Sequence, residues 1–238
     1  KQGQEEFRKL ELGDKENRKL WEWFRKVSLK DFERIYKILD TQFDVVLGEA
    51  FYEEDVKRLV PELVKKGIAK RSEGSLIIPL DKFGLPPALI QKSDGASLYL
   101  TRDIPNIAYR LKKYKPAKIF YVVGNEQSLH FEQLFKLAEI LRLNKAELRH
   151  IKYGLVLGEG GKKLSTREGT AILLEDLIDK IVGLARGAVE KKNPKLSLKE
   201  KDKIAAAVGV GALKYNDLKE NRHSDIVFDW ERMVSFSG

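Results

Sequence analysis

The sequence predicts an α/β protein that contains a parallel sheet of the nucleotide-binding type. Residues 118–123 (KIFYVV) form a continuous apolar run, which is typical of a strand covered on both faces. Residues 128–143 repeat apolar side chains at the spacing of an amphipathic helix, and residues 150–158 (HIKYGLVLG) form a second apolar run. A strand, a helix and a strand of these lengths predict a βαβ unit, whose two strands lie parallel.

Residues 1–40 are predicted to be helical. Ser28 stands three residues before Asp31, an arrangement that caps a helix, and the apolar side chains of the next turns share one face. Those apolar side chains belong to Phe32, Ile35, Tyr36 and Leu39.

Short elements are predicted over the next forty residues of the chain. Residues 43–48 (FDVVLG) predict a short strand, and residues 52–67 predict a helix that Pro61 bends or divides. Residues 69–80 predict a hairpin that turns at Glu73-Gly74. None of these elements carries residues with evident chemistry.

From residue 88 the pattern alternates strands with helices. Residues 88–91 (ALIQ) and 97–100 (SLYL) predict two short strands around a turn at Asp94-Gly95. Residues 103–114 predict a helix, with Pro105 tolerated because it lies in the first turn.

The last part of the chain combines a loop with helices. Residues 158–170 (GEGGKKLSTREGT) form a glycine-rich, basic and hydroxylated loop. Residues 175–192 predict a helix that ends before Asn193-Pro194. Residues 197–220 predict another helix, which begins on a capping box of Ser197 and Glu200.

Composition limits the possible classes of function. With 42% hydrophobic and 34% charged residues over 238 residues, the chain is predicted to be globular rather than disordered. The net charge of +9 favours a polyanionic partner such as a nucleic acid, and a lysine-rich surface explains it equally well. No apolar stretch approaches the length of a membrane span, and no signal-peptide pattern opens the chain.

The absence of cysteine excludes disulfides and cysteine-ligated metals and favours a reducing cytosol. A histidine-based metal site would need nearly all of the three histidines. Because the chain begins at Lys1 rather than at methionine and ends at VSFSG, we expect it to be a piece of a longer protein.

Ligands of open parallel sheets bind beyond the carboxyl ends of the strands, which selects three places expected to face one cleft. The first holds Tyr99 and Asp103, which suit a cationic ligand. A helix dipole that favours an acidic residue, beside a packing tyrosine, explains the same pair. The second place, Gly124 to His130, offers side chains for the polar groups of a ligand, and a capping loop sealed by His130 explains it equally well.

The third place is the loop of residues 158–170. It does not match a P-loop or the dinucleotide motif G-x-G-x-x-G, because the required glycines are missing. Its glycines, lysines and hydroxyls suit a mobile loop that closes on a polyphosphate, and a solvated basic loop explains them as well. Of the remaining histidines, His150 is expected to pack at a strand start and His223 to lie on the surface.

Several long blocks resemble the arginyl-tRNA synthetase family and follow its order and spacing. These are SDGASLYLTRDI, YVVGNEQSLHFEQL, HIKYGLVLGEGGKKLSTREGT, GALKYNDL and DIVFDWERMVSF, with KLELGDKENRKLWEWF and FDVVLGEAFYEE similar to its connecting region. The resemblance covers essentially the whole chain. It implies a class I synthetase that converts ATP and L-arginine into arginyl-adenylate and pyrophosphate, and then passes the arginyl group to tRNA(Arg).

The resemblance also implies a domain organisation. Residues 1–87 would be a connecting or inserted α+β segment, and residues 88–158 the second half of a Rossmann-type catalytic domain. Residues 159–238 would hold a loop of the KMSKS type and the helices that lead to the anticodon-binding domain.

For the substrates, the resemblance implies specific positions. Tyr99 and Asp103 match residues that hold the guanidinium of arginine, and Gln127 matches one that contacts bound arginine. His130 matches a histidine of the active-site cleft, assigned here to ATP. The ATP-binding candidates near the second apolar run are Gly154, Leu155, Val156 and Lys163.

The loop matches the KMSKS signature, whose role would be to fold over ATP and stabilise the leaving pyrophosphate. Its catalytic candidates are Lys162, Lys163, Ser165, Thr166 and Arg167. Thr166 replaces the second lysine of the signature, so Lys162, Lys163 and Arg167 all remain candidates to meet the phosphates. Mg²⁺ is expected to accompany ATP, with no metal site on the protein.

The other class I signature, His-x-Gly-His, is absent from the sequence, because the histidines stand at 130, 150 and 223. We expect it upstream of Lys1, and we therefore expect the fragment alone not to activate arginine. Two alternatives stay open: a non-catalytic RNA-binding module derived from a class I synthetase, and a synthetase for another amino acid. The protein is expected to act in the cytoplasm as a monomer, away from membranes.

Overall fold

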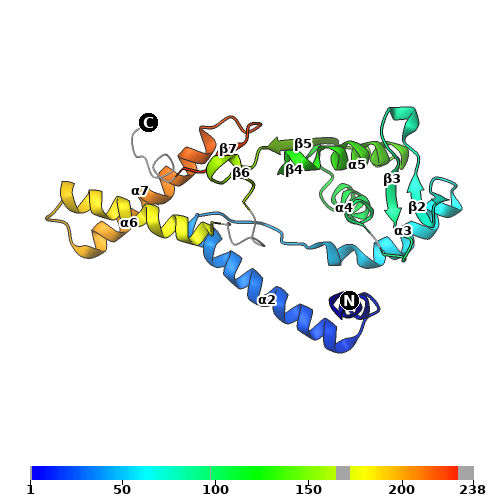
Figure 1. Ribbon diagram of the computed structural model, residues 1–238, viewed down its shortest axis with the longest axis horizontal. Coiled ribbons are helices and arrows are strands. Elements are labelled where there is room, and N and C mark those ends of the chain that lie inside the picture. Colours follow the sequence, from blue (N-terminus) through cyan, green and yellow to red (C-terminus); the bar gives the residue numbers. More distant parts are fainter. Residues whose placement is uncertain (1, 97, 165–171, 230–238) are drawn as a thin grey trace. The chain divides into compact units, whose positions relative to one another are not determined.

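The computed structural model describes residues 2–96, 98–164 and 172–229 and divides the chain into two compact units (Figure 1). The sheet unit comprises residues 46–170 and 218–229. The helical unit comprises residues 1–45, 171–217 and 230–238. The α/β class is confirmed, while the predicted division at residues 87 and 158 stays a prediction.

The predicted βαβ unit is confirmed, except that its second strand ends at Tyr153 and residues 156–157 of the predicted run form a separate strand. The βαβ unit consists of β4 (Lys118–Gly124), α5 (Ser128–Ile140) and β5 (Glu147–Tyr153). The two strands pair in parallel over their whole length, and Figure 1 shows α5 lying against them. Leu134 and Leu137 of α5 are fully buried, so this helix supplies much of the core beneath the strands.

The prediction that β4 is covered on both faces is wrong for this chain. Ile119 and Tyr121 are buried, whereas Phe120 and Val122, which alternate with them, are 54% and 66% exposed. Successive side chains of a strand point to opposite faces, so within the described part of the chain this strand is covered on the side of α5 alone. An apolar run therefore did not distinguish a strand packed on one face from a strand packed on both.

Before the βαβ unit, a three-stranded antiparallel sheet forms in the order β1-β2-β3. Strands β1 (Lys70–Ser72) and β2 (Ser75–Ile78) make the predicted hairpin, and β3 (Ala88–Gln91) pairs with β2. The turn residues Glu73 and Gly74 both have positive φ, 48° and 81°. That backbone matches the right-handed twist of the flanking strands, which confirms the hairpin signal in the sequence.

The helix predicted over residues 52–67 is confirmed as α3 (Glu53–Lys65), which contains Pro61 and follows the short helix η1 (Glu49–Tyr52). A second short helix, η2 (Asp81–Phe83), connects β2 to β3. Apolar residues of α3, the antiparallel sheet, α4 and the βαβ unit form one buried cluster. The antiparallel sheet and the βαβ unit therefore share a core.

The predicted strand over residues 97–100 is wrong, because α4 (Tyr99–Tyr114) begins there. Pro105 accordingly lies in the second turn of this helix and not in the first. Leu100 and Ile104 are buried on one helical face, and the hydroxyl of Thr101 donates to the carbonyl of Ile90. Helical spacing of these buried residues outweighs the short apolar pattern that suggested a strand.

Two expectations for the first fifty residues are also corrected. Ser28 lies inside the long helix α2 (Lys15–Ile38), which follows α1 (Gln2–Glu11). Its cap is Asp14, whose carboxylate accepts from the amides of Glu16 and Asn17. Residues 43–48 form no strand; Phe43 packs instead on Tyr36 of α2, with ring centroids 4.8 Å apart.

In the helical unit, α6 (Leu174–Lys192) and α7 (Leu198–Leu218) form a hairpin. The predicted capping box is confirmed, since the Ser197 amide donates to the Glu200 carboxylate and the Glu200 amide donates to the Ser197 hydroxyl. Lys201 is 4% exposed, and its ammonium donates to Glu190 and to the carbonyl of Pro194. These bonds satisfy the buried charge and fix how the two helices meet.

Helix α2 is attached to this hairpin at its C-terminal end. Arg34 pairs with Glu175 at 2.6 Å, and the ammonium of Lys214 donates to the carbonyl of Leu39 directly after α2. A lysine at this position also complements the negative end of the helix dipole. The N-terminal part of α2 carries exposed apolar side chains, among them Trp23, Phe24 and Val27.

The α6–α7 contact predicts opposite effects for two neighbouring glycines. A Cβ on Gly209 would lie 3.0 Å from Cα of Val182, so Gly209→Ala should push the helices apart and destabilise the unit by about 1–3 kcal/mol. Gly211→Ala meets no atom within 4 Å and should stabilise it by up to about 1 kcal/mol through helix propensity. Urea unfolding followed by the fluorescence of the tryptophans on α2 measures both; equal effects would contradict the close packing.

Tyr121 predicts a change of stability in alkali. Burial raises the pKa of its phenol to about 12, the charge of Asp103 adds to the rise, and Arg110 opposes it. The folded pKa of Tyr121 lies above its unfolded pKa. The contribution of the neutral phenol to the free energy of unfolding is therefore fully present below pH 10 and is lost as the pH rises toward 12.

Tyr121→Phe keeps the ring and removes the ionisable group. At pH 7 it should change the free energy of unfolding by less than about 1 kcal/mol, and at pH 11 it should make the variant the more stable protein by about 1 kcal/mol. Amide exchange in β4 measures this, because the described tryptophans lie in the other unit. If the free energy of unfolding of the wild type and of Tyr121→Phe differed by the same amount at pH 7 and pH 11, the predicted effect of the Tyr121 phenol would be wrong.

Candidate active site

Two predicted site residues, Asp103 and His130, lie in direct contact. Asp103 stands on α4 one turn after Tyr99, so the two side chains share a face of that helix. His130 stands in the first turn of α5, and its Nε2 lies 2.7 Å from Oδ2 of Asp103. The side chains of the pair are 20% exposed for His130 and 31% for Asp103. This contact joins two of the three places that the sequence singled out.

Further observations bear on the explanations left open for these residues, whose roles stay predictions. The first turn of α4 contains no acidic residue, because Asp103 lies beyond it, so the helix dipole does not account for this carboxylate. Tyr99 is 67% exposed and is not a packing tyrosine. At the start of α5, the Ser128 hydroxyl donates to the Asn125 carbonyl at 2.7 Å.

His130 contacts a group of aromatic rings, of which Phe131 and Tyr121 are buried and His150 is partly buried. Its imidazole meets Phe131 edge to face at 5.1 Å, and Phe131 lies 5.0 Å from Tyr121 and 4.3 Å from His150. His150 stands in the middle of β5 rather than at a strand start, and its Nε2 lies 2.9 Å from the carbonyl of Val123. His150 therefore packs as expected, although at a different position in the strand.

The turn that follows β4 makes contacts that sequence reasoning missed. It is the short helix η3 (Asn125–Gln127), which ends at the predicted site residue Gln127. The side-chain amide of Asn125 donates to the carbonyl of His223 at 3.0 Å, and the Glu126 carboxylate accepts from the Lys163 ammonium at 2.6 Å. Their position directly after Gly124, the glycine that ends strand β4, was the available signal. The Glu126–Lys163 pair joins the third predicted place to the second.

The loop expected to bind phosphates is described only as far as Leu164. Ser165, Thr166 and Arg167 lie outside the described residues. Strand β6 (Val156–Leu157) leads into η4 (Glu159–Gly161), and Leu157 bridges to Lys163, with the Gly158 amide donating to the Lys162 carbonyl at 2.7 Å. Lys162 and Lys163 are both exposed, so their ammonium groups can reach an anion.

The candidate ATP-binding residues Gly154, Leu155 and Val156 are fixed by a segment far away in the sequence. Strand β6 pairs in parallel with β7 (Ile226–Val227). The Gly154 amide donates to the carbonyl of Arg222 at 2.7 Å, and the Leu155 amide donates to the carboxylate of Asp225 at 2.7 Å. Asp225 opens the family block DIVFDWERMVSF, which carried no role for it, and Arg222 lies outside the quoted blocks. The surface position predicted for His223 is confirmed.

The expectation that all three places follow strands of one parallel sheet is wrong for the first place. The strand before Tyr99 is β3, which belongs to the antiparallel sheet, whereas β4 and β5 form the parallel pair. A side-chain contact between helices α4 and α5, rather than a common sheet edge, brings Asp103 to His130. A single cleft shared by all three places stays a prediction.

Comparison with known proteins identifies the family. A family model described as "tRNA synthetases class I (R), catalytic domain" matches residues 1–230. The chain belongs to this class I tRNA synthetase family. The resemblance drawn from the sequence blocks is therefore confirmed.

Two curated relatives of this family are close in sequence. An arginine–tRNA ligase of Streptococcus thermophilus is 48% identical over 239 aligned residues, and one of Streptococcus pneumoniae is also 48% identical. Each alignment includes 100% of this chain and 42% of the relative. The chain thus spans less than half the length of the ligases that it matches.

Solved structures of family members share the fold. The arginyl-tRNA synthetase of Plasmodium falciparum superposes with a TM-score of 0.82 at 26% identity, over 98% of this chain and 40% of that one. That of Thermus thermophilus superposes with a TM-score of 0.73 at 20% identity, over 97% of this chain and 44% of that one. The arrangement described above is therefore the arrangement of a class I synthetase catalytic domain.

Two negative findings apply to the described part of this synthetase segment. Across residues 2–96, 98–164 and 172–229, no three His, Asp or Glu side chains gather in a way that could hold a metal ion. No helix in those same ranges has the length and apolar character that a membrane crossing requires.

Gly154 gives a test of the β6–β7 arrangement. A Cβ at this position would lie 2.1 Å from the carbonyl oxygen of Ser224, so Gly154→Ala should displace residues 222–228. The amides of Ile226 and Phe228, which donate to Leu155 and Leu157, should then lose protection from hydrogen exchange. Gly124→Ala is the control, since its nearest atoms would lie at an ordinary 3.8 Å. Retained protection of these amides in Gly154→Ala would contradict the close approach of Gly154 to the Ser224 carbonyl.

Proposed function

We propose that the chain is part of an arginine–tRNA ligase, which uses ATP to activate L-arginine and transfers the arginyl group to tRNA(Arg). The observation that carries this proposal is the placement of Asp103, a half-buried carboxylate one turn from an exposed tyrosine and in contact with His130. In a chain of net charge +9, a cationic substrate requires such a local carboxylate. Arginine–tRNA ligase relatives at 48% identity support the same activity.

For arginine, the proposed residues are Tyr99, Asp103 and Gln127. The planar guanidinium pairs with a carboxylate through two parallel hydrogen bonds, and an aromatic face can stack on it. Tyr99 and Asp103 occupy one face of α4, and Gln127 ends the turn before α5, where its amide can contact the amino acid. The Asp103–His130 bond would then connect the arginine half of the site to the ATP half.

For ATP, the proposed residues are His130, Gly154, Leu155, Val156 and Lys163, with the main chain near β6 contacting adenine. The loop residues Lys162, Lys163, Ser165, Thr166 and Arg167 would close over the phosphates. Mg²⁺ would arrive bound to the ATP phosphates. Of the three candidate cations for the leaving pyrophosphate, Lys162 and Lys163 lie within the described residues, and Lys163 pairs with Glu126.

The reaction needs positioning and charge more than a protein nucleophile. The carboxylate of arginine attacks the α-phosphate in line, and pyrophosphate leaves with the negative charge that develops. Lys163 is held by Glu126 in the free chain, at 2.6 Å and with both side chains more than half exposed. An exposed ion pair of this kind is worth less than about 1 kcal/mol, so a polyphosphate can readily displace Glu126.

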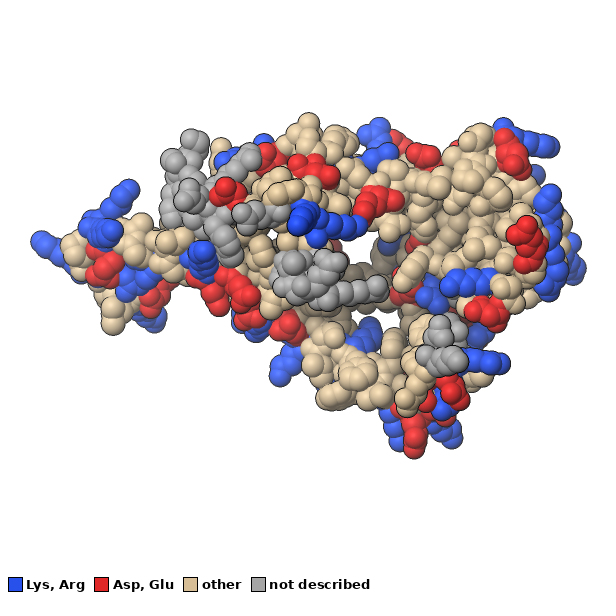
Figure 2. Space-filling model, viewed as in Figure 1, with Lys and Arg blue, Asp and Glu red and all other residues tan. Residues whose placement is uncertain are grey.

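The alternative function, a non-catalytic RNA-binding module, rests on the net charge alone. Figure 2 shows Lys and Arg interspersed with Asp and Glu over the visible face rather than gathered into one basic patch. A chain bound mainly through phosphates would favour a continuous basic surface. We therefore favour the ligase, acting as a monomer in the cytoplasm.

Asp103 provides the test of this function. In a full-length ligase that contains this segment, Asp103→Ala should reduce kcat/KM for arginine by about 30-fold or more, because losing a charge-assisted pair costs about 2–5 kcal/mol. ATP–pyrophosphate exchange in the presence of tRNA measures it. Asp179→Ala, an exposed aspartate of α6, is the matched control and should leave exchange unchanged. Unaltered KM and kcat for arginine in Asp103→Ala would remove the guanidinium assignment.

A further inference from the structure

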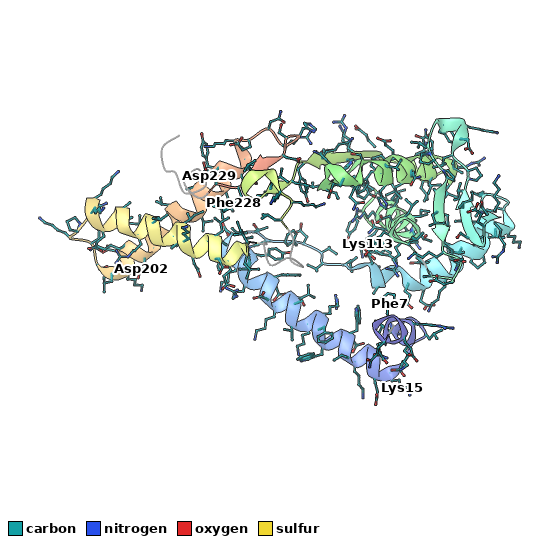
Figure 3. The ribbon with its side chains drawn as sticks, viewed as in Figure 1. Phe7, Lys15, Lys113, Asp202, Phe228 and Asp229 are labelled. Atoms are coloured by element: carbon teal, nitrogen blue, oxygen red, sulfur yellow. The ribbon has the colours of Figure 1, made fainter. Side chains whose placement is uncertain are left out.

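Residues 222–228, called the clasp here, follow α7 and return to the sheet unit. Strand β7 lies within the clasp and pairs in parallel with β6, as Figure 1 shows. Figure 3 labels Phe228 at the far end of the clasp. The proposed function assigns no role to these residues.

The main chain of the clasp is bonded to the segment that follows β5. The carbonyl of Arg222 accepts from the Gly154 amide, and the amides of Ile226 and Phe228 donate to the carbonyls of Leu155 and Leu157. The guanidinium of Arg222 adds a bond to the carbonyl of Lys152 at 2.9 Å. The clasp therefore follows the candidate ATP-binding segment along its whole length.

The side chain of Asp225 accepts a hydrogen bond from the Leu155 amide that a main-chain carbonyl would accept in a regular parallel ladder. In a parallel ladder, a residue whose carbonyl accepts from the partner strand also donates its amide to that strand. Leu155 accepts from Ile226, but its amide donates to the carboxylate of Asp225 at 2.7 Å. The Ser224 carbonyl, which would continue the ladder, lies instead against Gly154, where a Cβ would be 2.1 Å away. The Asp225 carboxylate thus accepts the Leu155 amide in place of the Ser224 carbonyl.

The clasp also reaches the other two segments of the nucleotide side. The carbonyl of His223 accepts from the side chain of Asn125, which begins the turn leading to Gln127 and His130. Strand β6, held on one edge by the clasp, bridges through Leu157 to Lys163. One segment therefore fixes the β6 strand, the η3 turn and the first residues of the phosphate loop.

We propose that Asp225 is a positioning residue for ATP: its bond to the Leu155 amide sets the strand that receives the adenine and, through that strand, Lys163. The inference rests on the proposed function, because it assigns ATP to this segment. Asp225 does not touch the substrate in this account. It acts by holding the main chain of Leu155, and it has no direct link to Asp103 or Tyr99.

The test compares two substitutions in a full-length ligase. Asp225→Ala removes the acceptor and should raise KM for ATP about tenfold, since a hydrogen bond to a charged group is lost, while KM for arginine stays the same. Asp225→Asn keeps an oxygen that can accept from the Leu155 amide and should recover most of the loss. Asp217→Ala, an exposed aspartate of α7, is the matched control.

A second measurement does not depend on activity. In the chain itself, Asp225→Ala should speed hydrogen exchange at the amides of residues 154–157, and Asp225→Asn should restore protection. Equal increases in KM for ATP and arginine, or no change in either, would overturn the inference while the ligase still works. If the wild-type ligase shows no arginine-dependent exchange, the proposed function itself fails, whatever the variants do.

Discussion

The parallel pairing of β4 with β5 is the constraint on which the site depends. The two strands run in register from Lys118 and Glu147 to Gly124 and Tyr153, so both end at the same place. The chain leaving β4 becomes the η3 turn, and the chain leaving β5 becomes the Gly154 segment. A shift of register would separate these two segments and the bonds that the clasp makes to both. The hydrogen-bond ladder of a short sheet therefore sets the geometry of groups that lie outside it.

Two acidic side chains give the site its polarity in a basic chain. Asp103 contacts His130, and Glu126 contacts Lys163, so each carboxylate is matched by a residue assigned to ATP. The first pair is half buried and the second is largely exposed. Partial burial limits the exchange of partners in the first pair, whereas exposure and screening make the second pair weak and easily exchanged.

Local signals in the sequence predicted the elements that depend on local interactions. The Glu73-Gly74 turn, the Ser197–Glu200 capping box and the βαβ unit were all predicted correctly, because turn backbone, capping and apolar spacing are encoded within a few residues. The strand predicted at residues 97–100 was wrong, since so short an apolar run suits a strand or the start of a helix. The two covered faces predicted for β4 were wrong as well, because an apolar run does not reveal what packs on each side.

For the site, sequence reasoning found Asp103 and His130 but not the contact between them, and it did not find Asn125 or Asp225. The partners of Asp225 and Leu155 stand 70 residues apart, and no pattern within one segment encodes such a pair. That separation also has a consequence for the order of folding. Bonds within the α6–α7 hairpin join Arg186 to Asp202 and Glu190 to Lys201, so they close short loops and can form early. Once formed, the hairpin shortens the effective distance that the chain must close before β7 meets β6. On the ribosome, the β6–β7 pairing can therefore form only after residue 228 has emerged, so this segment completes its helices before the contacts around its candidate site.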